Sequence, residues 1–293
     1  GVPMRVTFCG VRGSTPAPGA AFLRYGGNTS CVAVQAADEP IRLLLDAGTG
    51  IAAVTALLDG PYDGTILLGH LHWDHTHGLP FFGAGGAAGS RVRVLMPQQE
   101  PDAETVLARA FSPPHFPILP AQLGDGWTFA GIEEGEHHIA GFDLLAREIP
   151  HKGGRTFGYR VSAGGHSLAY LSDHSPSSLG AGPDGLGERH EAALALADGV
   201  DVLIHDAQHR AAEFPGVGYL GHASAEYAVA LGEEAGARAV VLFHHAPGRS
   251  DDDVDAMVRS VQHPGLVVLA AHEGLVMDLA EVGQEGPPSA LLT

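Results

Sequence analysis

The sequence around residue 70 reads Gly69-His70-Leu71-His72-Trp73-Asp74-His75-Thr76-His77-Gly78-Leu79-Pro80. It follows Thr65 to Leu68, an apolar run that predicts a buried strand, and the glycine and proline at its end indicate a turn. The histidines are therefore expected on a loop that leaves a strand. Histidine is the commonest metal-binding side chain, and this density of histidines is too high for ordinary packing. The first hypothesis is a metal site.

The spacing suits two metal ions. His70 and His72 are two positions apart, so in an extended segment they face the same way. Asp74 and His75 are adjacent and cannot easily join them on one ion without strain. Two ions need about four ligands each, allowing for a shared carboxylate and a water. The chain must therefore supply about three more ligands.

Three later polar residues are candidates for these additional ligands. His151, Asp173 and His244 each stand at or just past the end of an apolar run. His205, Asp206 and His209 also fall at a strand end, where they are candidates for partners that fix the tautomers of ligands. The ligand set is thus expected to come from several strand ends.

Strands and helices alternate along the chain. Apolar runs predict further strands at 5–9, 31–35, 41–46, 91–96, 142–148, 156–162, 167–172, 202–205 and 239–243. Helices are expected at 51–58, 103–111, 188–197 and 223–235, and from Ser250, which is a good N-cap. Because several strand ends carry His or Asp, the pattern indicates an α/β or α+β sandwich whose loops share one edge.

Charge and composition exclude some classes of protein. The chain has 16 basic and 34 acidic residues and a net charge of −18, with no basic run, which argues against tRNA or another large nucleic acid as partner. No apolar run is long enough for a membrane helix and no signal peptide is evident, so a cytoplasmic location is expected. Cys9 and Cys31 are expected to be buried free thiols rather than a disulfide.

The motif His70-x-His72-x-Asp74-His75, with His151, Asp173 and His244 after it, resembles the metallo-β-lactamase fold superfamily. The resemblance covers residues 4–278 and implies a single hydrolase domain with a four-layer αββα sandwich. Residues 281–293 are expected to form a loose C-terminal tail. The implied cofactor is two divalent metal ions, zinc in most members, with manganese and iron left open.

The resemblance assigns the metal ligands residue by residue. The first ion is implied to bind His70, His72 and His151, the second Asp74, His75 and His244, and Asp173 bridges the two. Asp46 matches an early aspartate that orients the ligand loops without binding metal. His245 leaves a one-position ambiguity, and His244 is preferred because it comes first after its apolar run.

Closer resemblance is to the RNase Z-like phosphodiesterases. Five segments carry it: 13–16, 27–30, His151 with 157–160, 171–173 and 221–224. True β-lactamases of this fold often have cysteine at the position of Asp173, and oxygen-reducing diiron members have glutamate at that of His72. Only 173 − 151 = 22 positions separate His151 from Asp173, which leaves no room for the tRNA-gripping arm of RNase Z enzymes.

The expected function is hydrolysis of small linear or cyclic phosphodiesters through a metal-bridging hydroxide. Asp74 is expected to orient the hydroxide, and His222, by resemblance, to protonate the leaving oxygen. Lys152, Arg155 and Arg12 are candidates for phosphate contacts, although a solvated basic side chain is the simpler interpretation of each. Trp73 is expected to pack rather than to contact substrate.

Two alternatives stay open. One is a lactone or thioester hydrolase of the same superfamily; lactonases of this fold typically carry tyrosine three positions after the bridging aspartate, where this chain has Pro176. The other is a metal-binding regulator without turnover. The oligomeric state, including a homodimer, and a lid role for the loop around His115 are also left open.

Overall fold

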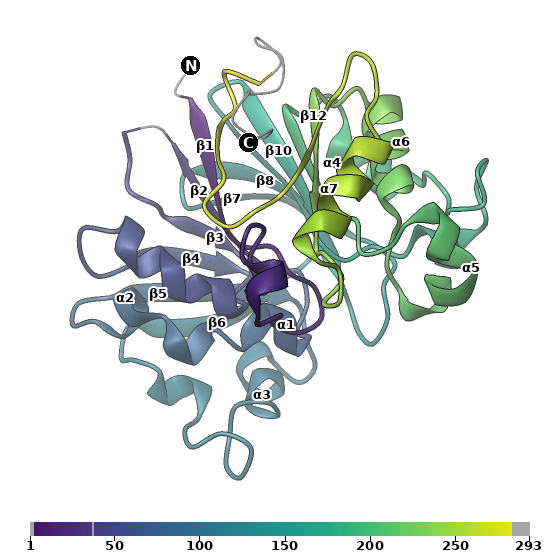
Figure 1. The fold of residues 1–293 in the computed structure, drawn as a ribbon. Helices are drawn as coiled ribbons and strands as arrows, with labels where there is room; N and C mark the ends of the chain where they lie inside the picture. Colours follow the sequence, from purple (N-terminus) through teal and green to yellow (C-terminus); the bar gives the residue numbers. More distant parts are fainter. Residues whose placement is uncertain (1–2, 37, 283–293) are drawn as a thin grey trace.

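The computed structural model describes residues 3–36 and 38–282, which form two seven-stranded sheets (Figure 1). The first sheet has the order β14 (Val276–Asp278), β1 (Met4–Gly10), β2 (Cys31–Ala36), β3 (Leu43–Leu45), β4 (Asp63–Leu67), β5 (Arg91–Pro97) and β6 (Trp127–Ile132). The second has the order β13 (Val267–Ala270), β12 (Ala239–Phe243), β11 (Val202–Asp206), β10 (His166–Leu171), β9 (Phe157–Ala163), β8 (Phe142–Glu148) and β7 (Gly135–Ile139).

Three apolar clusters show that the molecule has four layers. One cluster joins residues of both sheets, such as Leu45, Leu67, Tyr159 and Phe243, and fills the space between them. A second packs α4 (Glu191–Ala197), α6 (Ala225–Ala235) and α7 (Asp251–Ser260) on the second sheet. The third packs η2 (Thr49–Leu57), α2 (Gly83–Gly86) and α3 (Ala103–Ala108) on the first. The expected αββα sandwich is therefore confirmed.

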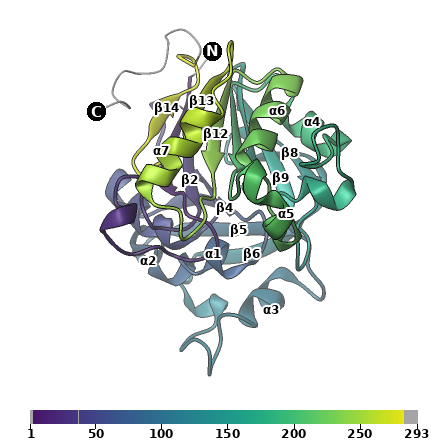
Figure 2. The ribbon, with the colours of Figure 1, turned by 45° about the vertical axis from the view of Figure 1, so that its right-hand side comes forward.

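Strand direction gathers the loops at one edge. β3 and β4 run parallel, and so do β10, β11 and β12. The carboxyl ends of parallel strands meet at the same edge of a sheet, and ligands of open α/β sheets bind there. The short helix α1 (Trp73–Thr76) lies at this edge, and in Figures 1 and 2 it stands between α2 and α5 (Phe214–Val217).

Local sequence signals account for several element boundaries. Ser250 caps α7 as expected, because its hydroxyl accepts a hydrogen bond from the Asp253 backbone N–H. The helix expected at 188–197 begins later, at Glu191, and the segment expected to be helical at 51–58 is a 3-10 helix. Four strands are not predicted from the sequence: β6, β7, β13 and β14. Residues 283–293 of the expected tail lie outside the described residues.

Cys9 and Cys31 are buried and free, as expected, and burial raises the pKa of the Cys31 thiol well above its ordinary value. Within the part of the chain that the structure describes, no helix combines the length and apolar character needed to cross a bilayer.

Candidate metal centre

All seven candidate ligands converge at the loop edge between the sheets. Donor atoms of His70, His72 and His151 lie within 4.8 Å of one another. A second group with the same mutual spacing contains four buried residues: Asp74, His75, Asp173 and His244. These are the two sets expected from the resemblance, with Asp173 grouped with the second.

Asp173 lies between the two sets. Its Oδ2 is 3.6 Å from His70 Nε2 and 3.5 Å from His151 Nε2. The same oxygen lies 3.3 Å from His244 Nε2, while Oδ1 lies 3.0 Å from His75 Nε2. One carboxylate therefore reaches histidines of both sets, as a bridging ligand must.

The hydrogen bonding of the buried histidines fits bound cations. Neither ring nitrogen of His70 forms a hydrogen bond, and His75 Nε2 forms none of proper geometry although two carboxylates are near. A buried polar atom without a partner costs about 1–3 kcal/mol. A divalent ion would complete His70 Nε2, which faces Asp173, and His75 Nε2, so the donor set suits a metal centre.

Electrostatics favour the ligating forms of His70 and Asp173. At His75, burial lowers the pKa, but the nearby carboxylates, Asp173 foremost, outweigh it and raise the pKa well above its ordinary value. Burial lowers the pKa of His70 well below its ordinary value, which keeps the imidazole neutral. Burial alone would raise the pKa of Asp173, but the imidazoles of His244, His75 and His70 outweigh it and hold that pKa well below the usual range. A neutral histidine beside an ionised carboxylate is the combination that a divalent cation binds.

Partners outside the cluster fix the orientation of the ligand rings. Asp46 accepts hydrogen bonds from His75 Nδ1 at 2.7 Å, from the Gly69 N–H at 2.8 Å and from the Tyr170 hydroxyl at 2.6 Å. Because a carboxylate only accepts, His75 carries a proton on Nδ1, and Nε2 is the nitrogen that faces the centre.

Hydrogen bonds from Nδ1 orient the rings of two other candidate ligands in the same way. Gln208 Oε1 accepts from His244 Nδ1 at 2.7 Å, and the Gly221 carbonyl accepts from His151 Nδ1 at 2.5 Å. Both rings therefore turn Nε2 towards Asp173. The sequence analysis did not find Gln208 or Tyr170, since a lone amide and a tyrosine within an apolar strand carry no ligand signal.

His222 stands beside the centre. Its Nδ1 donates to Asp206 Oδ2 at 2.8 Å, and its ring stacks on that of His244 at 4.9 Å between centroids. Burial lowers its pKa, but the Asp206 carboxylate outweighs burial and raises the pKa of His222 to about 9. Asp206 thus has the tautomer-fixing contact expected of a strand-end residue, although its partner is His222.

Other candidates lie outside the cluster. His245 Nε2 bonds the Ala271 carbonyl at 2.8 Å, so His244, and not His245, lies in the cluster of candidate donors. Arg12 is buried and its guanidinium donates to the carbonyls of Gly26, Ala246 and Arg249. Arg12 therefore ties loops together and is neither a solvated side chain nor a phosphate contact.

An aromatic group borders the centre. Trp73 is 69% exposed, so the expectation that it packs is wrong for most of its surface; its ring stacks only on His77, at 5.7 Å. His77 in turn meets Phe111. On another segment, the Lys152 ammonium lies 5.3 Å from the ring centroid of Tyr219, which is also 69% exposed.

Residues 41–245 match the family model of the beta-lactamase superfamily domain, and the chain belongs to this superfamily, whose members are mostly metal-dependent hydrolases. The sequence by itself matches no curated protein.

Three solved structures share the fold over nearly the whole chain. The metallo-beta-lactamase fold protein YhfI from Bacillus subtilis is 18% identical, with a TM-score of 0.70, 95% of this chain covered and 100% of that one. A diphosphatase from the PhnP family is 20% identical, with a TM-score of 0.65 and coverages of 94% and 97%. The short form of human tRNase Z is 20% identical, with a TM-score of 0.62 and coverages of 94% and 99%. At these identities the likeness shows the fold.

Proposed function

We propose that this protein is a dinuclear metal-dependent phosphodiesterase that acts on small linear or cyclic phosphodiesters. The observation that carries the proposal is the position of Asp173, whose carboxylate reaches His70 and His151 on one side and His75 and His244 on the other. The fold shared with a PhnP-family diphosphatase and a tRNase Z supports phosphoester chemistry.

The ligands of the two ions are assigned as follows. His70, His72 and His151 hold the first ion, Asp74, His75 and His244 the second, and Asp173 is shared. Zinc suits this set of imidazole and carboxylate donors best, although manganese and iron accept it too. Two such ions, when bound, acidify a water to near neutral pKa and offset the charge of the phosphate.

The remaining steps belong to side chains of the chain itself. Asp74 Oδ2 accepts a hydrogen bond from the Ser14 N–H at 2.9 Å, which fixes the carboxylate that orients the attacking water. His222, held by Asp206, donates a proton to the leaving oxygen. Both groups are buried, which keeps bulk water from competing with them.

A small substrate is proposed because little structure is available to hold a large one. Between His151 and Asp173 the chain forms only the hairpin of β9 and β10. The net charge of −18 repels a polyanion such as tRNA. The partner proposed is therefore a small anionic molecule. The cytoplasmic location and the homodimer stay predictions.

A parallel assay tests the proposal. Protein loaded with zinc or manganese is offered bis-p-nitrophenyl phosphate, nucleoside 2′,3′-cyclic phosphates and an acyl homoserine lactone, with metal content measured on the same sample. We expect about two ions per chain and faster hydrolysis of a phosphodiester. Preference for the lactone would contradict the proposal, and fewer than two ions without any hydrolysis would favour a non-catalytic regulator.

A further inference from the structure

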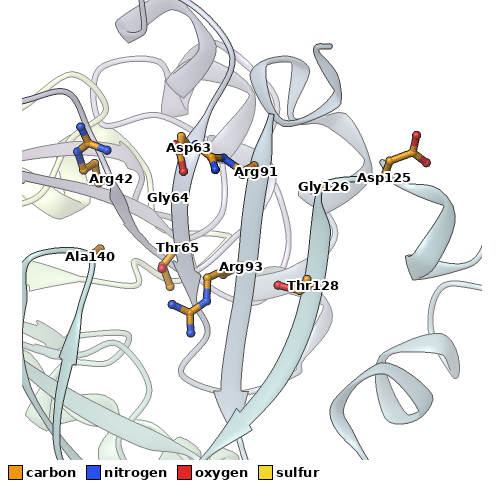
Figure 3. Close-up of a pocket in the computed structure, with 10 residues that line it drawn as sticks. All are labelled: Arg42, Asp63, Gly64, Thr65, Arg91, Arg93, Asp125, Gly126, Thr128 and Ala140. Atoms are coloured by element: carbon orange, nitrogen blue, oxygen red, sulfur yellow. Dashed lines mark hydrogen bonds and ion pairs between the residues drawn. The ribbon is translucent and has the colours of Figure 1, made fainter. Parts of the chain in front are cut away.

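A cleft of about 690 Å³ opens at the end of the sandwich opposite to the metal centre. Its walls are the beginnings of β4, β5 and β6 and the turn between β7 and β8, which carries Ala140 (Figure 3). Thr65 lines it near the start of β4, whereas His70 lies five positions further on, about 16 Å away in an extended chain. The cleft is therefore separate from the metal centre.

A row of three polar side chains crosses the floor of the cleft. Arg93 pairs with Thr65 of β4 on one side and with Thr128 of β6 on the other. Directly paired residues of neighbouring strands point to the same face of a sheet. Figure 3 shows all three side chains directed towards the turn with Ala140, whereas Asp125 points away.

This face is the inner face of the sandwich. Leu67 and Leu95, each two positions beyond a member of the row, belong to the apolar cluster between the sheets. Side chains two apart on a strand share a face. Arg93 lies on the same face as these leucines, but at the start of the strand, where its side chain is exposed in the cleft.

Protection of a sheet edge does not explain this arginine. Inward-pointing charges on edge strands prevent pairing with other chains. In the first sheet, however, β6 is the edge strand, and β5 lies between β4 and β6. An internal strand has no free edge to protect, so Arg93 does not serve that purpose.

The charges around the cleft leave Arg93 available to a ligand. Arg91 forms an ion pair with Asp63, at 3.0 Å. Arg93 and Arg42, which also lines the cleft, have no carboxylate partner within 4.0 Å among residues 3–36 and 38–282. Three of only 16 basic residues of an acidic chain line this one cleft.

We propose that the cleft binds the phosphate group of a small phosphorylated molecule. The guanidinium of Arg93 offers paired N–H donors that match phosphate oxygens, and the hydroxyls of Thr65 and Thr128 flank it as further donors. Arg42 adds positive charge at the rim. This site is independent of the phosphodiesterase proposal, since it shares no residue with the metal centre.

Nuclear magnetic resonance of the metal-loaded protein tests the site with inorganic pyrophosphate as probe. Amide signals of Thr65, Arg93 and Thr128 are expected to shift and saturate. Pyrophosphate also binds metals, so signals from the loops of the metal centre are followed separately. A second titration with acetate at equal ionic strength tests whether the site prefers phosphate oxygens to another anion. Absence of a saturable shift at the row, or equally tight binding of acetate, would overturn the proposal.

Variants test whether pyrophosphate binds at the row of Thr65, Arg93 and Thr128. Arg93→Gln is expected to weaken pyrophosphate binding at the row by about tenfold or more, with metal content unchanged. Arg5→Gln is the matched control, because Arg5 is an exposed strand arginine outside the cleft. Equal losses in both variants would show a general charge effect and refute the site.

A second variant keeps the test valid if Arg93→Gln fails to fold. Thr128→Val removes one hydroxyl with little change of shape at an exposed position of β6. We expect pyrophosphate to bind this variant about two- to tenfold more weakly. Unchanged affinity in both Thr128→Val and a folded Arg93→Gln would rule out the row as the binding site.

Discussion

Asp46 is the residue on which the geometry of the second ligand set depends most. It is fully buried and follows β3 in a left-handed conformation, with φ of 63°. Such a conformation is unfavourable for a residue with a side chain, and it persists when the surroundings fix it. Here three hydrogen bonds to the carboxylate, from His75, Gly69 and Tyr170, hold it.

Asp46→Asn should lower the affinity of the second ion by about 10- to 100-fold. An amide can turn its NH₂ towards His75 Nδ1, which then accepts, so the ring proton moves to Nε2 and faces the centre. Metal content after dialysis against a competing chelator measures the effect. Tyr170→Phe is the control, because it removes one bond to Asp46 and leaves the His75 contact. Full retention of both ions in Asp46→Asn would contradict this role.

His222→Ala should reduce kcat by about 10²- to 10⁴-fold on a phosphodiester with an alkoxide leaving group. The loss should be far smaller with p-nitrophenolate, which leaves without a proton. Steady-state kinetics on both substrates, with metal content measured, distinguishes loss of a proton donor from a general loss of activity. His77→Ala is the matched control, because His77 lies close by but outside the ligand clusters. Equal losses on both substrates would argue against proton donation by His222.

At the scale of elements, α7 is tied to the segment before β2. Asp251 accepts the backbone N–H groups of Arg24 and Tyr25, at 2.9 and 3.0 Å. The Tyr25 hydroxyl donates to Asp255 at 2.6 Å, and Arg24 pairs with the same carboxylate at 2.7 Å. These contacts hold a helix of the outer layer against the N-terminal loop.

Asp255→Asn should lower the free energy of unfolding by about 1 kcal/mol at pH 7, because it removes two charge-assisted hydrogen bonds from a partly exposed carboxylate. The hydrogen bond from Arg24 lowers the pKa of Asp255 in the folded protein. Its stabilisation is therefore present above the unfolded pKa of about 4 and is lost as pH falls through the lower folded pKa.

Urea unfolding of the Asp255→Asn variant and the wild type at several pH values checks this. The two free energies should differ from pH 7 down to about pH 4 and converge below it. Asp252→Asn is the control, since the Asp252 side chain is 95% exposed and should contribute little. A difference that grows as pH falls would have the wrong sign for this mechanism.

The sequence predicts those elements whose signal is local. Each of these signals spans only a few residues, so the pattern and the chemistry of the side chains are enough to predict the element or site. Examples are the motif at 70–75, the cap at Ser250, and the apolar runs before His151, Asp173 and His244. β6 and β7 are not predicted because each strand buries a single side chain, Trp127 in β6 and Ile139 in β7, so neither contains a run of buried apolar residues.

Longer-range contacts carry no such signal. Gln208 reaches His244 across 36 positions, and Tyr170 reaches Asp46 across 124. Only folding brings these pairs together, so neither could be assigned from residue type alone. The left-handed backbone at His244 likewise depends on tertiary contacts.

At the scale of the whole molecule, the metal centre joins the two sheets. Its proposed ligands follow β4 of the first sheet and β8, β10 and β12 of the second. Ions bound there would therefore bridge the two halves of the sandwich, and their binding free energy would add to the stability of the fold.

Removal of metal should lower Tm by on the order of 10 °C. A ligand at about 1,000 times its Kd adds about 4 kcal/mol to the free energy of unfolding. Each kcal/mol of that free energy raises Tm by about 2–4 °C in a large domain. Calorimetry with and without a chelator measures the shift, and the Asp173→Ala variant, treated identically, should show little change. The same Tm for the wild type in both conditions would mean that the ions do not couple to folding.

The two tryptophans of the chain occupy opposite environments. Trp127 is buried, and its indole donates to the Gly85 carbonyl at 2.9 Å; Trp73 is exposed between His72 and Asp74. Fluorescence from a buried indole is bluer and less open to iodide quenching than that from an exposed one. Because Trp73 lies between two proposed metal ligands, its fluorescence is expected to change when metal binds, and that of the buried Trp127 is expected to serve as an internal reference.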